Sequence, residues 1–165
     1  MAFEVFVSHS FGDSMMVDKI RSSLEIEGVK AYVAEADPRY GEALPAKIEK
    51  AIDSSDALIV ILTSQANVSA SVNQEIGYAK KAGKLLIPLV EDGVAVGVML
   101  QGLEFVKFSI DRIEDVFKDV VDYIAKRASE KERKDWSNTS SRVLIAFVVI
   151  AVFSIVAIVA LTRRK

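Results

Sequence analysis

Short apolar runs alternate, over the first 125 residues, with segments whose apolar positions repeat every three or four residues. The apolar runs predict five strands, over residues 3–8, 29–35, 57–63, 84–90 and 105–109. The third run, ALIVILT, is apolar at nearly every position, which is typical of a strand covered on both faces. Strands that alternate with helices in this way predict an α/β fold, a parallel sheet with helices on both faces.

Four segments predict helices, and the third of them carries a candidate for chemistry. This helix is predicted to span Ser71–Ala82, with Ser71 and Gln74 forming a capping box and Glu75 in the first turn. The other three are predicted to begin near Asp13, near Pro45 and near Ile113. Because acidic residues are favoured in first helical turns, the position of Glu75 by itself indicates no function.

The end of the chain predicts a membrane anchor. Val143–Thr162 contains 20 residues without a charge, about 30 Å of helix, which matches the thickness of a bilayer core. Residues 126–142 hold six basic side chains, against three in the tail 163–165, so the preceding domain is expected on the cytoplasmic side. The predicted organisation is a domain over 1–127, a basic linker over 128–142, a transmembrane helix over 143–162 and a basic tail.

Composition narrows the chemistry of the domain. Residues 1–125 hold 12 basic and 20 acidic side chains, which disfavours nucleic-acid binding. There is no cysteine, so thiolate chemistry, disulfides and cysteine-bound zinc are excluded. His9 is the only histidine, so a histidine-based metal site has too few ligands, and no metal is expected.

Ligands of open parallel sheets bind outside the carboxyl ends of the strands, where the strand order reverses. That rule selects three segments, residues 8–13, 37–44 and 64–75. None contains the glycine pattern of dinucleotide-binding folds or the lysine of a phosphate-binding loop. A phosphate-receiver domain is also excluded, because it needs acidic residues where this chain has Ser8-His9 and Thr63-Ser64.

What remains is one carboxylate, Glu75, over a polar crevice with Ser8, His9, Ser10 and Tyr40. A single carboxylate suffices when the leaving group needs no proton, as when nicotinamide departs from NAD⁺. A helix N-terminus would favour its ionised form. The alternatives stay open: Glu75 equally suits a surface helix start, and the serines equally suit a turn that caps the next helix.

Four stretches together resemble a TIR (Toll/interleukin-1 receptor) domain of the prokaryotic type. They are FVSHS, the loop around Gly41, SDALIVILTS and QEIGYAKKAGKLLIPL, within a match that runs from Phe3 to Ile124. The resemblance implies a flavodoxin-like, five-stranded sheet and, in many members, cleavage of NAD⁺ as substrate at the nicotinamide–ribose bond. It implies that Glu75 is the catalytic residue.

The resemblance also implies the remaining site residues. The nicotinamide-ribose pocket maps to Ser8, His9, Ser10 and Phe11. The loop Asp37–Leu44, with Tyr40, Gly41 and Ala43, matches the family's BB loop, which contributes to assembly and often closes a neighbour's active site. This chain departs from the family in Ser71, where many enzymatic members carry Trp, and in Ala43, where one animal NADase has a bulky side chain. Both departures bear on pocket shape and product identity.

Two functions of different classes follow. The first is a membrane-anchored NAD⁺ glycohydrolase, forming linear or cyclic ADP-ribose and activated by self-association in defence or cell-death signalling. The second is a non-catalytic module that recruits other TIR domains through the loop Asp37–Leu44. A more distant third is an enzyme that resembles nucleoside deoxyribosyltransferases and would ignore NAD⁺.

Overall fold

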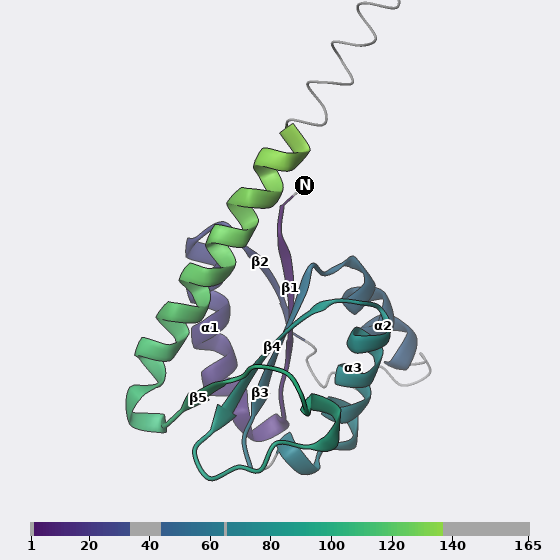
Figure 1. Ribbon diagram of the computed structural model, residues 1–165, viewed down its shortest axis with the longest axis vertical. Coiled ribbons are helices and arrows are strands. Elements are labelled where there is room, and N and C mark those ends of the chain that lie inside the picture. The colour runs from purple at the N-terminus through teal and green to yellow at the C-terminus, as the bar shows by residue number, and fades with distance from the viewer. Residues whose placement is uncertain (1, 34–43, 65, 137–165) are drawn as a thin grey trace, which may run out of the picture. The chain divides into compact units, whose positions relative to one another are not determined.

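Five parallel strands form one sheet in the order β2-β1-β3-β4-β5 (Figure 1). Their bounds are β1 Glu4–Ser8, β2 Lys30–Val33, β3 Ala57–Leu62, β4 Leu85–Glu91 and β5 Val106–Phe108. The computed structural model describes residues 2–33, 44–64 and 66–136. The order confirms the predicted flavodoxin-like sheet, and it reverses beside β1, so ligands of this fold are expected at the carboxyl ends of β1 and β3.

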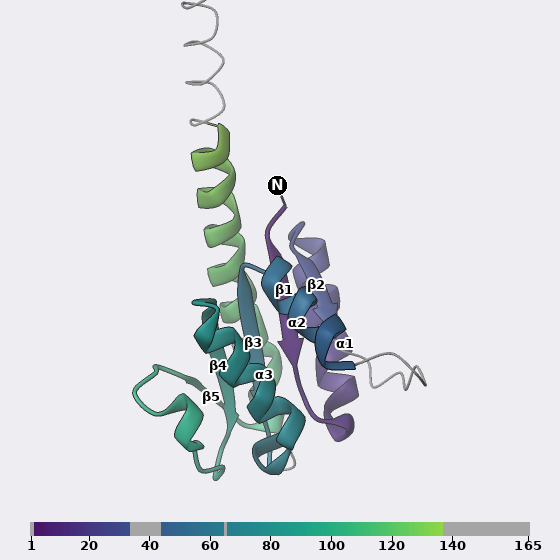
Figure 2. The ribbon, with the colours of Figure 1, turned by 90° about the vertical axis from the view of Figure 1, so that its right-hand side faces the viewer.

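Helices cover both faces of the sheet (Figure 2). One face carries α1 (Ser14–Ile26) and the first part, up to Ala128, of a helix over residues 113–136. The other face carries α2 (Leu44–Ser54) and α3 (Ala70–Lys81). Short 3₁₀ turns lie between these elements, at Phe11–Asp13, Ala66–Val68, Val98–Leu100 and Ile110–Arg112.

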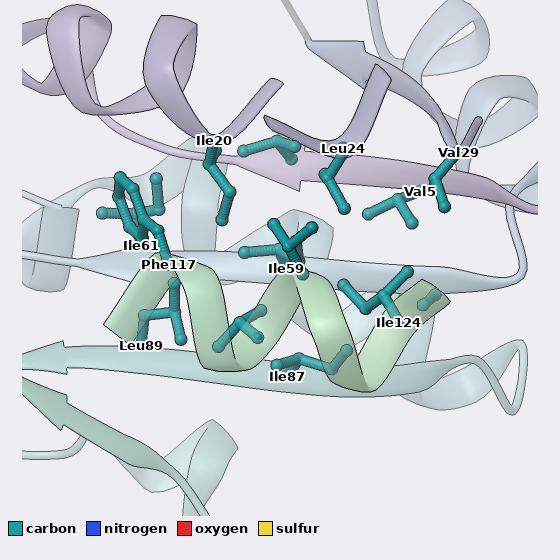
Figure 3. Close-up of a cluster of buried hydrophobic side chains, with 14 of the residues drawn as sticks. Val5, Ile20, Leu24, Val29, Ile59, Ile61, Ile87, Leu89, Phe117 and Ile124 are labelled. Carbon is teal, nitrogen blue, oxygen red and sulfur yellow. The ribbon is translucent and has the colours of Figure 1, made fainter. Parts of the chain in front are cut away.

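The strand pattern assigns each side chain to a face. All six residues of β3 are buried, as the continuous apolar run predicts. On the first face, Ile20 of α1 and Ile124 of the last helix converge on Ile59 of β3 (Figure 3). Because side chains alternate along a strand, Val5 and Val7 of β1 join this cluster. Phe6 and, at the end of the strand, Ser8 therefore face α2 and α3.

The start of α3 differs from the sequence-based expectation. The helix begins at Ala70, and the cap is Ser69, whose Oγ accepts a hydrogen bond from the backbone N–H of Val72 at 3.5 Å. The capping box between Ser71 and Gln74 is therefore wrong, because two serines lie two residues apart and the earlier one caps the helix. Glu75 is consequently in the second turn of α3, not the first.

The last helix extends into the segment that was predicted to be a linker. Residues 128–136, predicted as the beginning of a linker, continue the helix that starts at 113. Their content of Ala, Glu, Lys and Arg favours a helix on intrinsic propensity. The predicted transmembrane helix over 143–162 lies outside the described residues. Within those residues, no helix combines the length and the apolar character that crossing a bilayer requires.

Candidate functional site

Glu75 occupies a core-facing position of α3. The buried residues of this helix are Val72, Glu75, Ile76 and Ala79, a spacing that defines one helical face. Three of the four are apolar and pack in the core, and Glu75 is only 7% exposed. A carboxylate at such a position costs free energy to bury, so it is not the solvated surface charge that a helix-start interpretation describes.

Ser8 is the polar partner of this carboxylate. Its hydroxyl lies at the end of β1 and donates a hydrogen bond to Glu75 Oε2 at 2.5 Å, across 67 positions of sequence. Ser8 is 0% exposed, because its strand is central in the sheet and its side chain faces α3. The structure thus brings together two of the three segments that the strand-end rule selects, residues 8–13 and 64–75.

Burial governs the ionisation of Glu75. It raises the pKa of this carboxyl from 4.5 to about 7, and the hydrogen bond from Ser8 opposes part of that rise. The expectation that the helix N-terminus favours the ionised form is wrong, because Glu75 is the sixth residue of α3 and the influence of a helix terminus fades within the first turn. At neutral pH the carboxyl is therefore about half ionised.

A cavity of about 410 Å³ gives Glu75 access to a ligand. It lies between α2 and α3, and its volume falls within the range of about 300–1,000 Å³ that small-molecule sites occupy. The side chain of Ser71 is exposed and lies in the wall. The complete lining is Ile48, Glu49 and Ile52 from α2, with Ser71, Gln74, Glu75, Gly77, Tyr78 and Lys81 from α3. Ser8 is not part of the wall.

Comparison with known families identifies the fold. The sequence profile described as TIR domain matches residues 5–121. The chain belongs to the TIR domain family. A search of curated proteins gives no significant match.

Solved structures with a similar fold have low sequence identity to this chain. The TIR domain of a Toll-related receptor from Hydra magnipapillata has a TM-score of 0.62 at 17% identity, over 74% of this chain and 97% of that one. A CMP N-glycosidase from Clostridium botulinum has a TM-score of 0.52 at 17% identity, over 71% and 97%. A 2-desoxiribosyltransferase from Leishmania mexicana has a TM-score of 0.50 at 19% identity, over 70% and 96%. These likenesses concern the fold.

The loop after β1 of the TIR domain is held by a residue that sequence reasoning missed. The buried carboxylate of Asp13 accepts hydrogen bonds from Ser10 Oγ at 2.9 Å and from Thr63 Oγ1 at 3.1 Å. It ties this loop to the end of β3. Ser10 donates hydrogen bonds to Asp13 from both its hydroxyl and its backbone N–H. The sequence pattern identifies Asp13 only as a residue near the start of a helix.

Two of the other predicted site residues, His9 and Phe11, follow β1. His9 is half-buried, burial lowers its pKa, and its Nδ1 has no hydrogen-bond partner among the described residues. Because its pKa is lowered, the imidazole is neutral near pH 7. Among the described residues, it forms no hydrogen bond with Glu75. Phe11 begins the 3₁₀ turn after β1. Tyr40, Gly41 and Ala43 lie outside the described residues.

Tyr78 is a second feature that the sequence analysis did not single out. It lies three residues after Glu75, lines the same cavity and donates a hydrogen bond from its hydroxyl to Asp53 Oδ2 at 2.9 Å. This bond joins α3 to α2 beside the cavity. Among the described residues, no cluster of three or more acidic, histidine or cysteine side chains is arranged to hold a metal ion.

Proposed function

We propose that this TIR domain is an NAD⁺ glycohydrolase that cleaves the nicotinamide–ribose bond, with Glu75 as its catalytic residue. The observation that carries the proposal is a carboxylate on the core-facing side of α3 that also lines a cavity of ligand size. Groups with strongly perturbed pKa values in cavities are typical of active sites.

The chemistry requires one carboxylate. The bond that breaks joins the anomeric carbon of ribose to the pyridinium nitrogen, which takes the electron pair and leaves as neutral nicotinamide. The sugar becomes a cation of oxocarbenium type, which ionised Glu75 stabilises through its negative charge in a site of low dielectric constant. Water then adds to the carbon and passes a proton to Glu75, which releases it to solvent. The products are ADP-ribose, nicotinamide and a proton.

The environment of Glu75 suits this role. A base works best when its pKa lies near the working pH, and burial places the pKa of Glu75 at about 7. Most glycosidases need a second carboxyl to protonate their leaving group. Nicotinamide needs no such proton, which is consistent with one buried carboxylate at this site.

In the same proposal, Val143–Thr162 anchors the protein in a membrane with the TIR domain in the cytoplasm. Copies associate through the loop Asp37–Leu44, as TIR domains commonly self-associate. Confinement to a membrane raises the effective concentration of the copies, so activity rises with their density. A role in defence or cell-death signalling follows from the resemblance to prokaryotic TIR domains.

The test measures NAD⁺ consumption and product chromatography for the 165-residue chain in lipid vesicles at increasing surface density. Glu75→Gln is expected to lower the rate at least about 100-fold, because general base catalysis and charge stabilisation each contribute that much or more. The matched control is Glu25→Gln, which changes an exposed glutamate on α1 and should leave the rate unchanged. The chromatogram separates linear from cyclic ADP-ribose.

The alternative function is a non-catalytic TIR module that signals through contacts between TIR domains. It predicts no release of nicotinamide at any density and self-association that survives Glu75→Gln. CMP and a 2′-deoxynucleoside are included as substrates, since two structural neighbours are a CMP N-glycosidase and a 2-desoxiribosyltransferase. Turnover of those compounds without turnover of NAD⁺ would overturn the proposal in favour of nucleoside chemistry.

A further inference from the structure

We propose that Ser8 is a positioning residue: its hydroxyl holds the Glu75 carboxylate, in its ionised form, at the wall of the cavity between α2 and α3. This inference rests on the proposed function of Glu75 and replaces the expectation that Ser8 contacts the substrate. Ser8 has no exposed surface and does not line the cavity, whereas Glu75 does.

The contact between Ser8 and Glu75 is short, as a hydrogen bond to an ionised carboxylate would be. The 2.5 Å separation of Ser8 Oγ and Glu75 Oε2 lies at the short end of the range for O–H···O⁻ bonds, about 2.5–2.7 Å. An ionised carboxylate can only accept, so the serine hydroxyl donates. With Oε2 engaged by Ser8, Oε1 forms no hydrogen bond within the described part of the chain and is available to a ligand.

Both partners are fixed by the elements that carry them. Ser8 is paired with Val60 of β3 and ends a central strand, so the sheet determines where its side chain points. Glu75 is flanked on α3 by Val72 and Ile76, which are packed in the core. A carboxylate held between a strand and a helix keeps its orientation better than one on a loop, which is what a catalytic group requires.

Other charged groups near the cavity do not replace Ser8. The titratable side chains that share the cavity wall with Glu75 are Glu49 from α2, and Tyr78 and Lys81 from α3. Among the described residues, none of them forms an ion pair with Glu75. Burial and the hydrogen bond from Ser8 are the two influences on its pKa.

The decisive experiment measures the pKa of Glu75 directly, by carbon-13 NMR of the glutamate carboxyl groups in the 165-residue chain. Glu75→Gln assigns the signal. Ser8→Ala is expected to raise this pKa by about one unit, because a hydrogen bond to a charged group contributes that order of free energy. Ser55→Ala is the matched control: Ser55 is also a buried serine, but its hydroxyl donates to Ala51 O. It should leave the pKa unchanged.

Activity measurements add a signature that a merely structural role would not give. With a pKa one unit higher, Ser8→Ala has about tenfold less ionised Glu75 at about pH 6 and nearly the same amount at about pH 9. The rate should therefore fall about tenfold at the lower pH and recover toward the wild-type rate at the higher pH, with KM for NAD⁺ little changed. If Ser8→Ala does not fold, Ser8→Cys places a weaker donor on a somewhat larger side chain and should raise the pKa by a smaller amount.

The two proposals fail in distinguishable ways. An unchanged pKa of Glu75 in both Ser8 variants, with NAD⁺ turnover intact, would overturn the role of Ser8 and leave the glycohydrolase. A wild-type chain that turns over no NAD⁺ while Ser8→Ala raises the pKa would overturn the glycohydrolase and leave the coupling of Ser8 to Glu75. A raised pKa together with a shifted pH profile supports both.

Discussion

Replacing Glu75 with glutamine is expected to stabilise the fold while it removes activity, and the gain in stability should depend on pH. Glutamine has nearly the same size and shape as glutamate but carries no charge. The substitution therefore keeps the packing beside Val72 and Ile76 and removes the cost of burying an ionised carboxylate. If the substitution instead disrupted the structure in general, it would lower the free energy of unfolding.

The size of the gain follows from the pKa, which burial raises from 4.5 to about 7. A carboxyl with a raised pKa in the folded state favours the fold in its protonated form. That contribution is complete below about pH 4.5 and is lost as the pH rises through about 7. Since each unit corresponds to about 1.4 kcal/mol, the free energy of unfolding of Glu75→Gln should exceed that of the wild type by about 3 kcal/mol near pH 8. The difference should shrink steadily toward about pH 4.5.

The assay is urea unfolding of the 165-residue chain, followed by circular dichroism at a series of pH values. Taking the difference between the two proteins cancels the titration of all other groups that they share. Glu25→Gln, at an exposed position, provides the baseline and should show little pH-dependent difference from the wild type. A difference for Glu75→Gln that does not vary with pH, or a wild type that is the more stable protein at about pH 8, would refute the reasoning.

Two further predictions concern the framework of the site. Ile59→Ala should lower the free energy of unfolding by about 2–5 kcal/mol, because it leaves a cavity in a fully buried strand. The matched control is Ile26→Ala, at a side chain that is 82% exposed, which should change the free energy of unfolding by less than about 0.5 kcal/mol. Equal effects of the two in urea unfolding would contradict the assigned core. Asp13→Asn should cost about 1–3 kcal/mol, since the buried carboxylate accepts a hydrogen bond from Thr63. The control is the exposed Asp92→Asn, and an unchanged urea midpoint for Asp13→Asn would mean that Asp13 does not hold the loop.

The sheet could be predicted from sequence because its signals are local. The uninterrupted run Ala57–Leu62 indicates a strand covered on both faces, and the structure buries every residue of it. Gly28 adopts φ +74° just after α1, a conformation that glycine favours and that commonly ends a helix. The convergence of Ser8 and Glu75 also follows from a general rule, because parallel strands bring their carboxyl ends to one edge.

The burial of Glu75 was missed because the sequence analysis placed it in the first turn of α3, where side chains are commonly solvated. Ser69 and Ser71 are both good caps, and only the tertiary fold selects Ser69. Placing Glu75 in the first turn gives it a solvated environment and a lowered pKa. In the structure it lies in the second turn, on the core-facing side with Val72 and Ile76, and burial raises its pKa. The role of Asp13 was missed for a related reason, since Thr63 is 50 positions away.

The energetic cost of Glu75 helps to decide between the two functions. An interaction module uses surfaces, and nothing in that role requires an ionisable group between Val72 and Ile76. At neutral pH the buried carboxylate destabilises the fold by about 3 kcal/mol, a large share of the 5–15 kcal/mol that domains of this size commonly have. A glutamine or an apolar residue would avoid that cost. Catalysis, in contrast, needs a charged oxygen in a cavity from which water is largely excluded, and such sites trade stability for activity. If Glu75→Gln is more stable than the wild type and inactive toward NAD⁺, the trade of stability for activity is shown directly. If Glu75→Gln is more stable and signals as well as the wild type, the interaction module is favoured.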